Sequence, residues 1–441
     1  MEQRRKNLTQ LFIPICLETL LYMLSGMVDT LMLSSVNDQA VGAVGTANTY
    51  IGIFIIMFSV ISSGMVAVMT QNIGAGRPGV AYQARQLGLA FNAVLGVIMS
   101  LFLSLGAGTI LSGVGVADAL MQPAKTYLQI VGGFCILNAL IPICSSYLRA
   151  FGFSKEPLYA SIIGNVINFC LNAFFLFVLH KGVAGVATAT VVSRIINLVI
   201  VVLLGAVLVK AKKHPERESN REVMGQIIRI GLPSACETAI YNVSMTLVIR
   251  FLNQMDAQGL NVTARSYTMQ ITNFSYCVGA ALAQANAIMT GWRIGAKEYD
   301  ACDRGTRKAA IIGVIVAVIL ETMFALCSGW IMQLFSKDPQ MVSLVGKLLA
   351  IDIVLEMGRV TNLVYGQALK TSGDAVFPVV MGACFMILCS VGGTYLFGIR
   401  LGLLAVGAYI GMAGDECVRA IGMYLRWKSG KWKQKGLVKS R

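Results

Sequence analysis

Acidic residues lie inside the long apolar segments of this sequence, where an ionisable side chain is costly and therefore indicates a function. Glu18 and Asp29 lie in the first such segment, Glu237 in the seventh and Glu356 in the tenth. A carboxyl group in these surroundings can exchange a proton, or it can hold a sodium ion while it is ionised. We therefore expect these four residues to couple the chain to a cation gradient.

A proline precedes two of these carboxylates by four residues, as Pro14 precedes Glu18 and Pro233 precedes Glu237. Proline inside a helix removes a backbone hydrogen bond and bends the chain, and a residue four positions on lies on the same face. We expect hinges at both prolines. The alternative is that each carboxylate is satisfied by a neighbour and only packs two helices. For Asp29, near the outer end of its segment, the alternative is a solvated carboxylate.

Four further acids lie within apolar segments: Glu321, Asp352, Asp415 and Glu416. Glu356 lies three residues before Arg359, and Asp415 lies four residues before Arg419. Both spacings permit an ion pair on one helix face. A structural clamp is favoured for Asp415, whereas Glu356 stays open between clamp and coupling residue. Spacing indicates no partner for Glu321 or Asp352.

Three amides follow one another in the fifth apolar segment. Asn165, Asn168 and Asn172 are spaced by three and four residues, which places them on one stripe of a helix. Amide groups join helices in membranes, and their carbonyl oxygens can also bind a cation. Both roles are open for this stripe.

Composition indicates an all-α polytopic membrane protein. The 441 residues are 56% hydrophobic and only 13% charged, whereas soluble domains carry about 25% charged residues. Continuous apolar runs favour helices, since backbone exposed to lipid must satisfy its own hydrogen bonds. We predict twelve transmembrane helices, at about 8–34, 41–70, 86–112, 124–148, 157–179, 183–209, 225–253, 260–290, 308–334, 340–368, 375–398 and 401–426.

The distribution of lysine and arginine predicts the orientation. Basic residues concentrate in the N-terminus, in the loops after the even-numbered segments and in the C-terminal tail. The positive-inside rule then places both termini in the cytoplasm of a multi-pass protein of the plasma (inner) membrane. The net charge of +15 is explained by this topology and by contact with membrane lipid, so no nucleic-acid partner is expected.

The sequence repeats itself in two halves. A basic cytoplasmic linker, 210–224, separates an N-terminal lobe, 1–209, from a C-terminal lobe, 225–441, which includes the basic tail. The matching positions, each pair separated by a nearly constant offset close to half the chain, are Pro14 and Pro233, Glu18 and Glu237, 73–75 and 294–296, Gly152 and Gly373, Pro157 and Pro378, and Gly185 and Gly407. Each lobe has six predicted helices, so the repeats enter the membrane in the same sense, and substrate sites in such proteins lie between repeats.

Signatures of catalysis and of bound cofactors are missing from the sequence. It has no phosphate-binding Gly-x4-Gly-Lys-Ser/Thr loop, no Gly-x-Ser-x-Gly and no His-Glu-x-x-His pattern. Its eleven cysteines lack the spacing of a zinc site, and its two histidines, His180 and His214, are far apart. We expect no enzyme activity, no cofactor and no metal other than sodium.

Several short motifs carry a resemblance to a known family. They are Val28-Asp-Thr-Leu-Met-Leu-Ser34, Gly74-Ala-Gly76 followed by Arg85, Gly182-Val-Ala-Gly-Val-Ala-Thr-Ala-Thr190, Gly231-Leu-Pro233, and Leu369-Lys-Thr-Ser-Gly-Asp374 before Pro378. In this order they span essentially the whole chain, which resembles the multidrug and toxic compound extrusion (MATE) transporters.

The resemblance implies two six-helix lobes arranged as a V and a role for Asp29 in coupling. The family often has Asn-x-x-x-Asp in the fifth helix, where this chain has Asn168 and Asn172, so the second position cannot titrate here. Many relatives carry a second-lobe carboxylate at the position of Tyr241. The residues expected to contact the cation or substrate are Asn165, Asn168, Asn172, Thr190, Tyr241 and Arg359.

The function that we expect is a secondary active multidrug antiporter. It would export organic cations or amphipathic compounds in exchange for protons or sodium by alternating access, working as a monomer. Two alternatives are a flippase or exporter of lipid-linked saccharides or other metabolites, and an integral membrane enzyme that modifies lipids. The flippase would need a wide basic cavity and the enzyme a polar cluster near one interface, and the sequence favours neither.

Overall fold

The computed structural model describes residues 6–35, 38–113, 116, 118–210, 216–256, 258–333 and 335–438. Those ranges contain helices, turns and loops but no strand, so the all-α prediction is confirmed. His214 and part of the predicted linker lie outside the described residues. By contacts, the chain forms two compact units, Met1–Gly231 and Leu232–Arg441.

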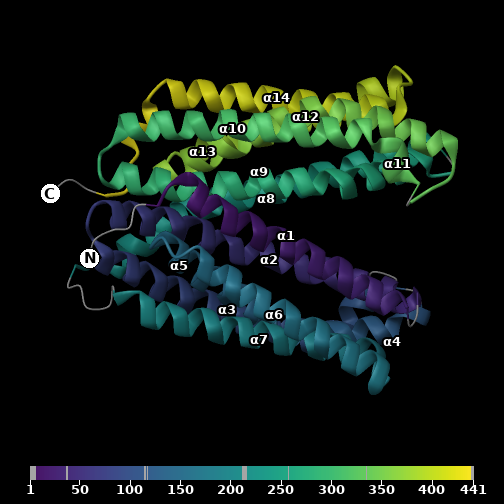
Figure 1. Ribbon diagram of the computed structural model, residues 1–441, viewed down its shortest axis with the longest axis horizontal. Helices are drawn as coiled ribbons and strands as arrows, with labels where there is room; N and C mark the ends of the chain where they lie inside the picture. Colours follow the sequence, from purple (N-terminus) through teal and green to yellow (C-terminus); the bar gives the residue numbers. More distant parts are fainter. Residues whose placement is uncertain are drawn as a thin grey trace. The chain divides into compact units, whose positions relative to one another are not determined.

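The first unit is a bundle of long helices that run side by side (Figure 1). Its elements are α1 (Leu8–Ser34), α2 (Asp38–Gly74), α3 (Pro78–Gly113), α4 (Asp118–Tyr127), the π-helical η1 (Leu128–Gly132), α5 (Ile136–Ala150), α6 (Lys155–Ala173), the π-helical η2 (Phe174–Val178), α7 (Gly182–Leu208) and the first turns of α8 (Asn220–Met255). Helix α1 packs on α6, and α3 packs on α2 and α5.

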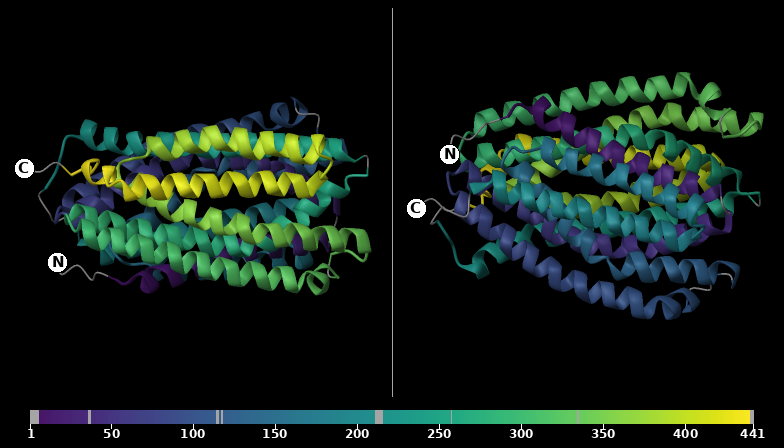
Figure 2. Two further views of the ribbon diagram at one scale, coloured as in Figure 1. Left: turned by 90° about the horizontal axis from the view of Figure 1, so that it is seen from above. Right: turned by 60° about the horizontal axis from the view of Figure 1, so that its bottom comes forward.

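The second unit is also a bundle of long helices, seen from two further sides in Figure 2. It contains the rest of α8 and then α9 (Leu260–Gly295), α10 (Tyr299–Leu326), α11 (Ser328–Met332), α12 (Pro339–Ser372), α13 (Val376–Phe385), the π-helical η4 (Met386–Val391) and η5 (Thr394–Arg400), α14 (Leu404–Lys428) and the 3₁₀ turn η6 (Lys431–Gln434). Helix α12 is central, because it packs against α9, α10 and α14.

Helices overlie each of the twelve predicted apolar segments, but their hydropathy differs. Seven helices in the described residues are long and apolar enough to cross a membrane, or eight if the pair Asp118–Gly132 and Ile136–Ala150, bent by 43°, counts as one span. Helices α8, α9, α12 and α14 are outside this set. Buried polar and ionic side chains lower their hydropathy, and the number of twelve spans stays a prediction.

Each unit has its own buried apolar core, and large apolar side chains also point outward. Leu33, Phe58 and Leu128 belong to the first core. Leu105 and Leu326, by contrast, are 83% and 82% exposed. Apolar side chains on the outside of a helical bundle suit contact with lipid.

Local sequence sets the ends of α12, the helix that carries Asp352, Glu356 and Arg359. Asp338 accepts a hydrogen bond of 3.0 Å from the backbone N–H of Gln340 and caps the helix, and Pro339 occupies its first turn. Gly373 ends the helix with a φ of 98°, a conformation that favours glycine. These signals fix the register in which the α12 side chains face their neighbours.

Candidate functional site

The first group of predicted residues lies between α1 and α6 of the first unit. Nδ2 of Asn172 donates a hydrogen bond of 2.6 Å to Oδ1 of Asp29. The same nitrogen lies 3.2 Å from Oδ1 of Asn168. Asn172 is fully buried, Asn168 is 5% exposed, and Asp29 is half-buried. One titratable acid is thus joined to two amides whose charge is fixed.

The third amide of the stripe holds the same two helices together. Nδ2 of Asn165 donates to the backbone carbonyl of Leu21 at 3.5 Å. The spacing of three and four residues places the three amides on one face of α6, from which Asn165 and Asn172 contact α1. Asn165 joins the helices at the level of Leu21, and Asn172 contacts the acid further along.

Two residues that sequence reasoning did not assign complete the surroundings of Asp29. Arg194 of α7 lies close enough to Asp29 to interact with it electrostatically, and Tyr127 of α4 lies near both. Thr190 of α7 is 7% exposed and donates its hydroxyl to the Val186 carbonyl at 2.9 Å. The signal for Arg194 was its position inside an apolar segment, but spacing gave it no partner.

Glu18 and Glu237 each contact a basic side chain. Oε2 of Glu18 lies 2.6 Å from Nη2 of Arg149, and the Ser161 hydroxyl is 3.4 Å from its other oxygen. Oε2 of Glu237 lies 2.5 Å from Nζ of Lys370. Arg149 and Lys370 occupy equivalent positions of the two repeats, each shortly before one of the matching glycines. Each unit therefore holds an equivalent ion pair one turn after its proline.

Pro14 lies inside α1 and leaves the carbonyl of Gln10 without its usual backbone donor. The hydroxyl of Ser154, in the turn before α6, donates to that carbonyl at 3.0 Å. One turn later the Thr19 hydroxyl donates to the Ile15 carbonyl at 2.8 Å. The weakened turn of α1 is therefore held by side chains.

Pro233 occupies the equivalent place inside α8. The Thr238 hydroxyl donates to the Ser234 carbonyl at 3.1 Å. In both units, therefore, a threonine hydroxyl bonds to the carbonyl of the residue that directly follows the proline. The repeat places Ala375 at the position that matches Ser154, and alanine has no hydroxyl. The two predicted hinges thus differ in this side-chain contact.

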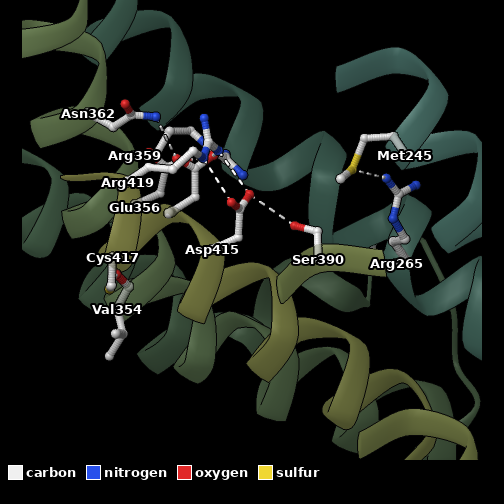
Figure 3. A network of polar contacts seen from close by, with 11 residues as sticks. Met245, Arg265, Val354, Glu356, Arg359, Asn362, Ser390, Asp415, Cys417 and Arg419 are labelled. Atoms are coloured by element: carbon white, nitrogen blue, oxygen red, sulfur yellow. Dashed lines mark hydrogen bonds and ion pairs between the residues drawn. The ribbon is translucent and has the colours of Figure 1, made fainter. Parts of the chain in front are cut away.

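The second unit contains a buried network of charges (Figure 3). Glu356 pairs with Arg359, and Asp415 accepts from Nε of Arg419 at 2.9 Å. Both ion pairs predicted from the spacing are therefore confirmed. Glu416 joins the two pairs, since its Oε1 lies 2.9 Å from Nη2 of Arg419 and 3.5 Å from Nε of Arg359.

Two tyrosines lie beside this network. The guanidinium of Arg359 is 6.0 Å from the ring centroid of Tyr276 on α9. Tyr241 of α8 lies close enough to Arg359 to interact with it electrostatically. The structure thus brings together Tyr241, Glu356 and Arg359, which the sequence suggested separately.

Two acids that the sequence left without a partner come together with Glu356. Glu321 of α10 and Asp352 of α12 each offer a carboxylate oxygen, and these oxygens and one of Glu356 all lie within 4.8 Å of one another. Asp352 and Glu356, four residues apart, share a face of α12. Only the packing of α10 against α12 brings Glu321 to them, so spacing along the chain could not reveal the group.

Comparison with known proteins identifies the family. The MatE family model matches residues 14–174 and again residues 233–396. The chain belongs to the MATE family. Because two stretches match one model, this MATE protein contains two copies of the same domain, and the two matches begin at the two helix prolines, Pro14 and Pro233. Members of the family are membrane transporters rather than enzymes, and this chain is a multi-pass membrane protein of that kind.

Relatives match this MATE chain over nearly its full length. "Uncharacterized transporter YisQ" of Bacillus subtilis is 34% identical over 431 residues, 96% of this chain and 94% of the relative. "Probable multidrug resistance protein NorM" of Thermotoga maritima is 24% identical, over 98% of this chain and 94% of the relative.

Solved structures show the same fold. One described as "MATE in the straight conformation" has a TM-score of 0.86 at 20% identity, over 97% of this chain and 96% of that chain. Another, "MATE in the bent conformation", has a TM-score of 0.87 at 19% identity, with the same shares covered.

Proposed function

We propose that this MATE protein is a secondary active antiporter that exports organic cations or amphipathic compounds in exchange for protons or sodium. The observation that carries the proposal is the Asp29 site, in which Asn172 donates to a carboxylate inside an apolar helix. An ionisable residue there is costly and fits a cation pathway. A driving ion supplies about 2.3 kcal/mol per charge and 100 mV, so no cofactor is needed.

Coupling would start when a cation from outside replaces the Asn172 amide as the partner of Asp29. Asn168 and Asn172 offer carbonyl oxygens next to the carboxylate, so a proton or a sodium ion would both find partners. Arg194 would oppose the binding of such a cation, since its positive charge lies near Asp29. Release of the cation would return the carboxylate to the amide.

Glu18, Glu237 and Glu356 are proposed as further coupling residues under a stricter condition. Each of them contacts a basic side chain. A cation must therefore compete with that side chain, and the ion pair must open during the cycle. Opening of the Glu18 pair would free α1 from α5 just beyond Pro14.

Alternating access would use the turn at Pro14, with Pro233 as the second hinge. The two structural neighbours described as straight and bent MATE support the idea that this fold adopts more than one conformation. In this chain the bend would require the Ser154 hydroxyl to leave the Gln10 carbonyl.

The substrate class is proposed from the relatives and from the polar residues. Several relatives are named as probable multidrug resistance proteins. Asn165, Thr190, Tyr241 and Arg359 are the proposed contacts for substrate or cation, and acidic side chains in both units favour a positively charged compound.

The assembly is proposed on sequence grounds. Twelve spans would form two six-helix lobes arranged as a V, 1–209 and 225–441, joined by the basic linker 210–224. Both termini would face the cytoplasm of the plasma (inner) membrane, because basic residues concentrate on that side. One chain with two lobes would work as a monomer in contact with membrane lipid.

Dye efflux from reconstituted vesicles tests the function. A fluorescent organic cation would be followed while a pH gradient and a sodium gradient are imposed separately, with a matched no-gradient control. Export that depends on either gradient is expected. Equal export with neither gradient would remove the antiport assignment.

A further inference from the structure

The C-terminal tail, residues 429–438, folds back on the end of the second unit where α14 stops (Figure 1). Trp427 at the end of α14 and Trp432 in η6 are 2% and 1% exposed. Their rings stack with centroids 4.1 Å apart. The indole N–H of Trp432 also donates to the Trp427 carbonyl at 2.9 Å. The tail is therefore packed into the unit.

Two other helices of the second unit hold the tail in place. The indole N–H of Trp427 donates at 2.8 Å to Oδ1 of Asp303, near the start of α10. A Cβ atom on Gly373, which ends α12, would collide with the Lys435 carbonyl oxygen. The tail backbone thus passes directly over the end of α12 and is joined to α10 by a side chain.

This packing leaves the lysines of the tail region outside. Four of them flank the buried Trp432 and are exposed, namely Lys428, Lys431, Lys433 and Lys435. Within the described ranges, none of the four forms an ion pair with an acid. The tail therefore presents a group of positive charges that the protein itself does not neutralise.

The start of α10 adds basic side chains beside the tail. Arg304 and Lys308 are exposed and lie on one face of the helix, since they are four residues apart. Neither is in an ion pair with a residue that the structure describes. Asp300, on the preceding turn, is an exposed acid. Positive charge nevertheless predominates where α10 begins and the tail ends.

Exposed apolar side chains place these basic residues at the edge of the lipid. On α14, Ile421 and Leu425 are 59% and 56% exposed, and Lys428 follows on the same face. On α10, the exposed Lys308 comes two turns before Ile315, which is 53% exposed. Each helix thus changes from apolar to basic on its outer face, at the end where the tail lies. Basic side chains at such a boundary reach the lipid headgroups.

Phospholipid phosphates suit this surface in charge and in position. A lysine binds phosphate as a point charge, so a group of lysines does not require one fixed ligand geometry. The end that carries the tail is the one proposed to face the cytoplasm. The cytoplasmic leaflet is negatively charged and attracts basic segments that directly follow a transmembrane helix.

We propose that the C-terminal tail and the start of α10 form a binding surface for anionic phospholipid, in which the two stacked tryptophans hold the lysines in place. Only the choice of leaflet depends on the proposed orientation. Lipid binding to the purified chain needs no transport, so the surface can be tested apart from the antiport function.

Native mass spectrometry of the full chain, purified in an uncharged detergent, tests the surface. Phosphatidylglycerol and phosphatidylcholine with the same acyl chains are added separately at rising concentration, and each bound molecule is counted. Phosphatidylglycerol should bind more tightly than phosphatidylcholine. Inorganic phosphate at the same concentration should not displace it, because the acyl chains also contact the exposed apolar side chains.

Lys431→Gln with Lys433→Gln should weaken phosphatidylglycerol binding by about tenfold or more, since each basic residue near an anionic surface contributes about fivefold. Lys337→Gln with Lys347→Gln is the matched control. It removes two exposed lysines near the opposite end of α12 and should leave the affinity unchanged. Lys431→Arg with Lys433→Arg keeps both charges and should retain binding.

Trp432→Ala tests whether the tryptophans hold the surface together. The variant keeps every lysine but loses the ring that stacks on Trp427. Cleavage by trypsin in the tail should become faster, and phosphatidylglycerol binding should weaken although the net charge is unchanged. A tail that is cleaved faster while lipid binding stays the same would contradict the role of the tryptophans.

Three further results would overturn the surface: equal affinity for the two lipids, equal loss of binding in the two lysine-to-glutamine variants, or displacement of the lipid by inorganic phosphate. These results differ from failure of the transport proposal. Phosphatidylglycerol binding without gradient-driven efflux would remove the antiport assignment and leave the surface. Gradient-driven efflux without selective lipid binding would do the opposite.

Discussion

Asp29 depends on one amide for its polar contact. Among the described residues, the hydrogen bond that it accepts comes from Asn172, while the positive charge of Arg194 lies nearby. A site with one titratable group exchanges at most one proton. The acid itself, rather than the amides, should therefore decide whether a pH gradient drives transport.

Replacing Asp29 with asparagine should lower efflux driven by a pH gradient by at least about tenfold, a general acid or base being worth about 10²–10⁴-fold in proton transfer. The shape and the Asn172 contact are kept, and only the titratable group is lost. Dye efflux from proteoliposomes measures the effect. Thr30→Val, which alters a hydroxyl bonded to the Gly26 carbonyl of the same helix, is the control. Full pH-driven efflux by Asp29→Asn would contradict the assignment.

The ion pair between Glu18 and Arg149 gives a second prediction. Their side chains are 14% and 11% exposed, so breaking the pair should destabilise the protein by about 3 kcal/mol, as for other buried pairs. Glu18→Arg should therefore lower the unfolding temperature, and Glu18→Arg with Arg149→Glu should recover part of the loss. Thermal unfolding in detergent and dye efflux are measured together.

If Glu18 serves only the ion pair, the exchanged pair should recover stability and efflux together. If Glu18 also binds the coupling cation, stability should return without efflux. The matching exchange of Glu237 and Lys370 in the second unit provides the internal comparison. No recovery of stability in either unit would show that these pairs are not the stabilising contacts.

Side-chain pairs could be predicted from sequence only where one helix carries both members. Glu356 with Arg359 and Asp415 with Arg419 followed from spacings of three and four residues. Arg149 lies 131 residues from Glu18, and Lys370 is similarly remote from Glu237. Such partners depend on which helices pack together, and no local pattern specifies that.

Helix α1 combines a weakened turn with a side chain that replaces the missing bond. Pro14 cannot donate to the Gln10 carbonyl, and Ser154 donates instead. The positions of the helices could be predicted from the apolar runs, because lipid and protein core both favour apolar side chains. The hydrogen bond from Ser154 to the Gln10 carbonyl could not be predicted, since it joins the start of α1 to a turn 144 residues away.

Ser154→Ala should destabilise the protein by about 1 kcal/mol, the usual net value of one hydrogen bond. In a Pro14→Ala background the restored N–H can bond to Gln10, so the same change should cost much less. A double-mutant cycle by chemical unfolding measures this coupling. Equal effects of Ser154→Ala in both backgrounds would mean that the hydroxyl does not replace the missing donor.

Close contact between α2 and the first turns of α8 fixes how this part of the first unit packs. A Cβ atom on Gly64 would lie 1.9 Å from the Ile227 carbonyl oxygen, and one on Gly231 would lie 1.7 Å from that of Val60. Only glycine permits backbones to approach so closely. The close packing of α2 against the first turns of α8 therefore depends on Gly64 and Gly231.

Gly64→Ala should destabilise the first unit by about 1–3 kcal/mol or more, the usual cost of overpacking, because backbone must move. Gly52→Ala on the same helix has open space around it and should be neutral or stabilising by up to about 1 kcal/mol. Unfolding temperatures of both variants test the difference. Equal temperatures would show that α8 can shift at no cost.

At the scale of the whole chain, the scaffold and one ion pair are repeated, but the other buried acids are not. The family model matches two stretches, and the prolines, the ion pairs and the π-helical segments η2 and η5 recur at equivalent places in both. Asp29, however, corresponds to Val248. Glu321, Asp352 and Glu356 correspond to Ser100, Val131 and Cys135. Each unit therefore has its own polar site on a shared scaffold.

This asymmetry predicts that the two gradients act through different units. If Asp29 takes the proton and the second unit's carboxylates take sodium, Asp29→Asn should remove efflux driven by a pH gradient while keeping efflux driven by a sodium gradient, since the second unit's carboxylates are untouched. Glu321→Gln should do the reverse. Each charge moved through 100 mV supplies about 2.3 kcal/mol, so loss of one coupling should lower the dye gradient by up to about fiftyfold. Steady-state dye gradients in proteoliposomes measure both variants under both gradients, with the exposed-acid variant Asp300→Asn as the control. Loss of both activities in either single variant would contradict the division, because it would mean that both ions use one site.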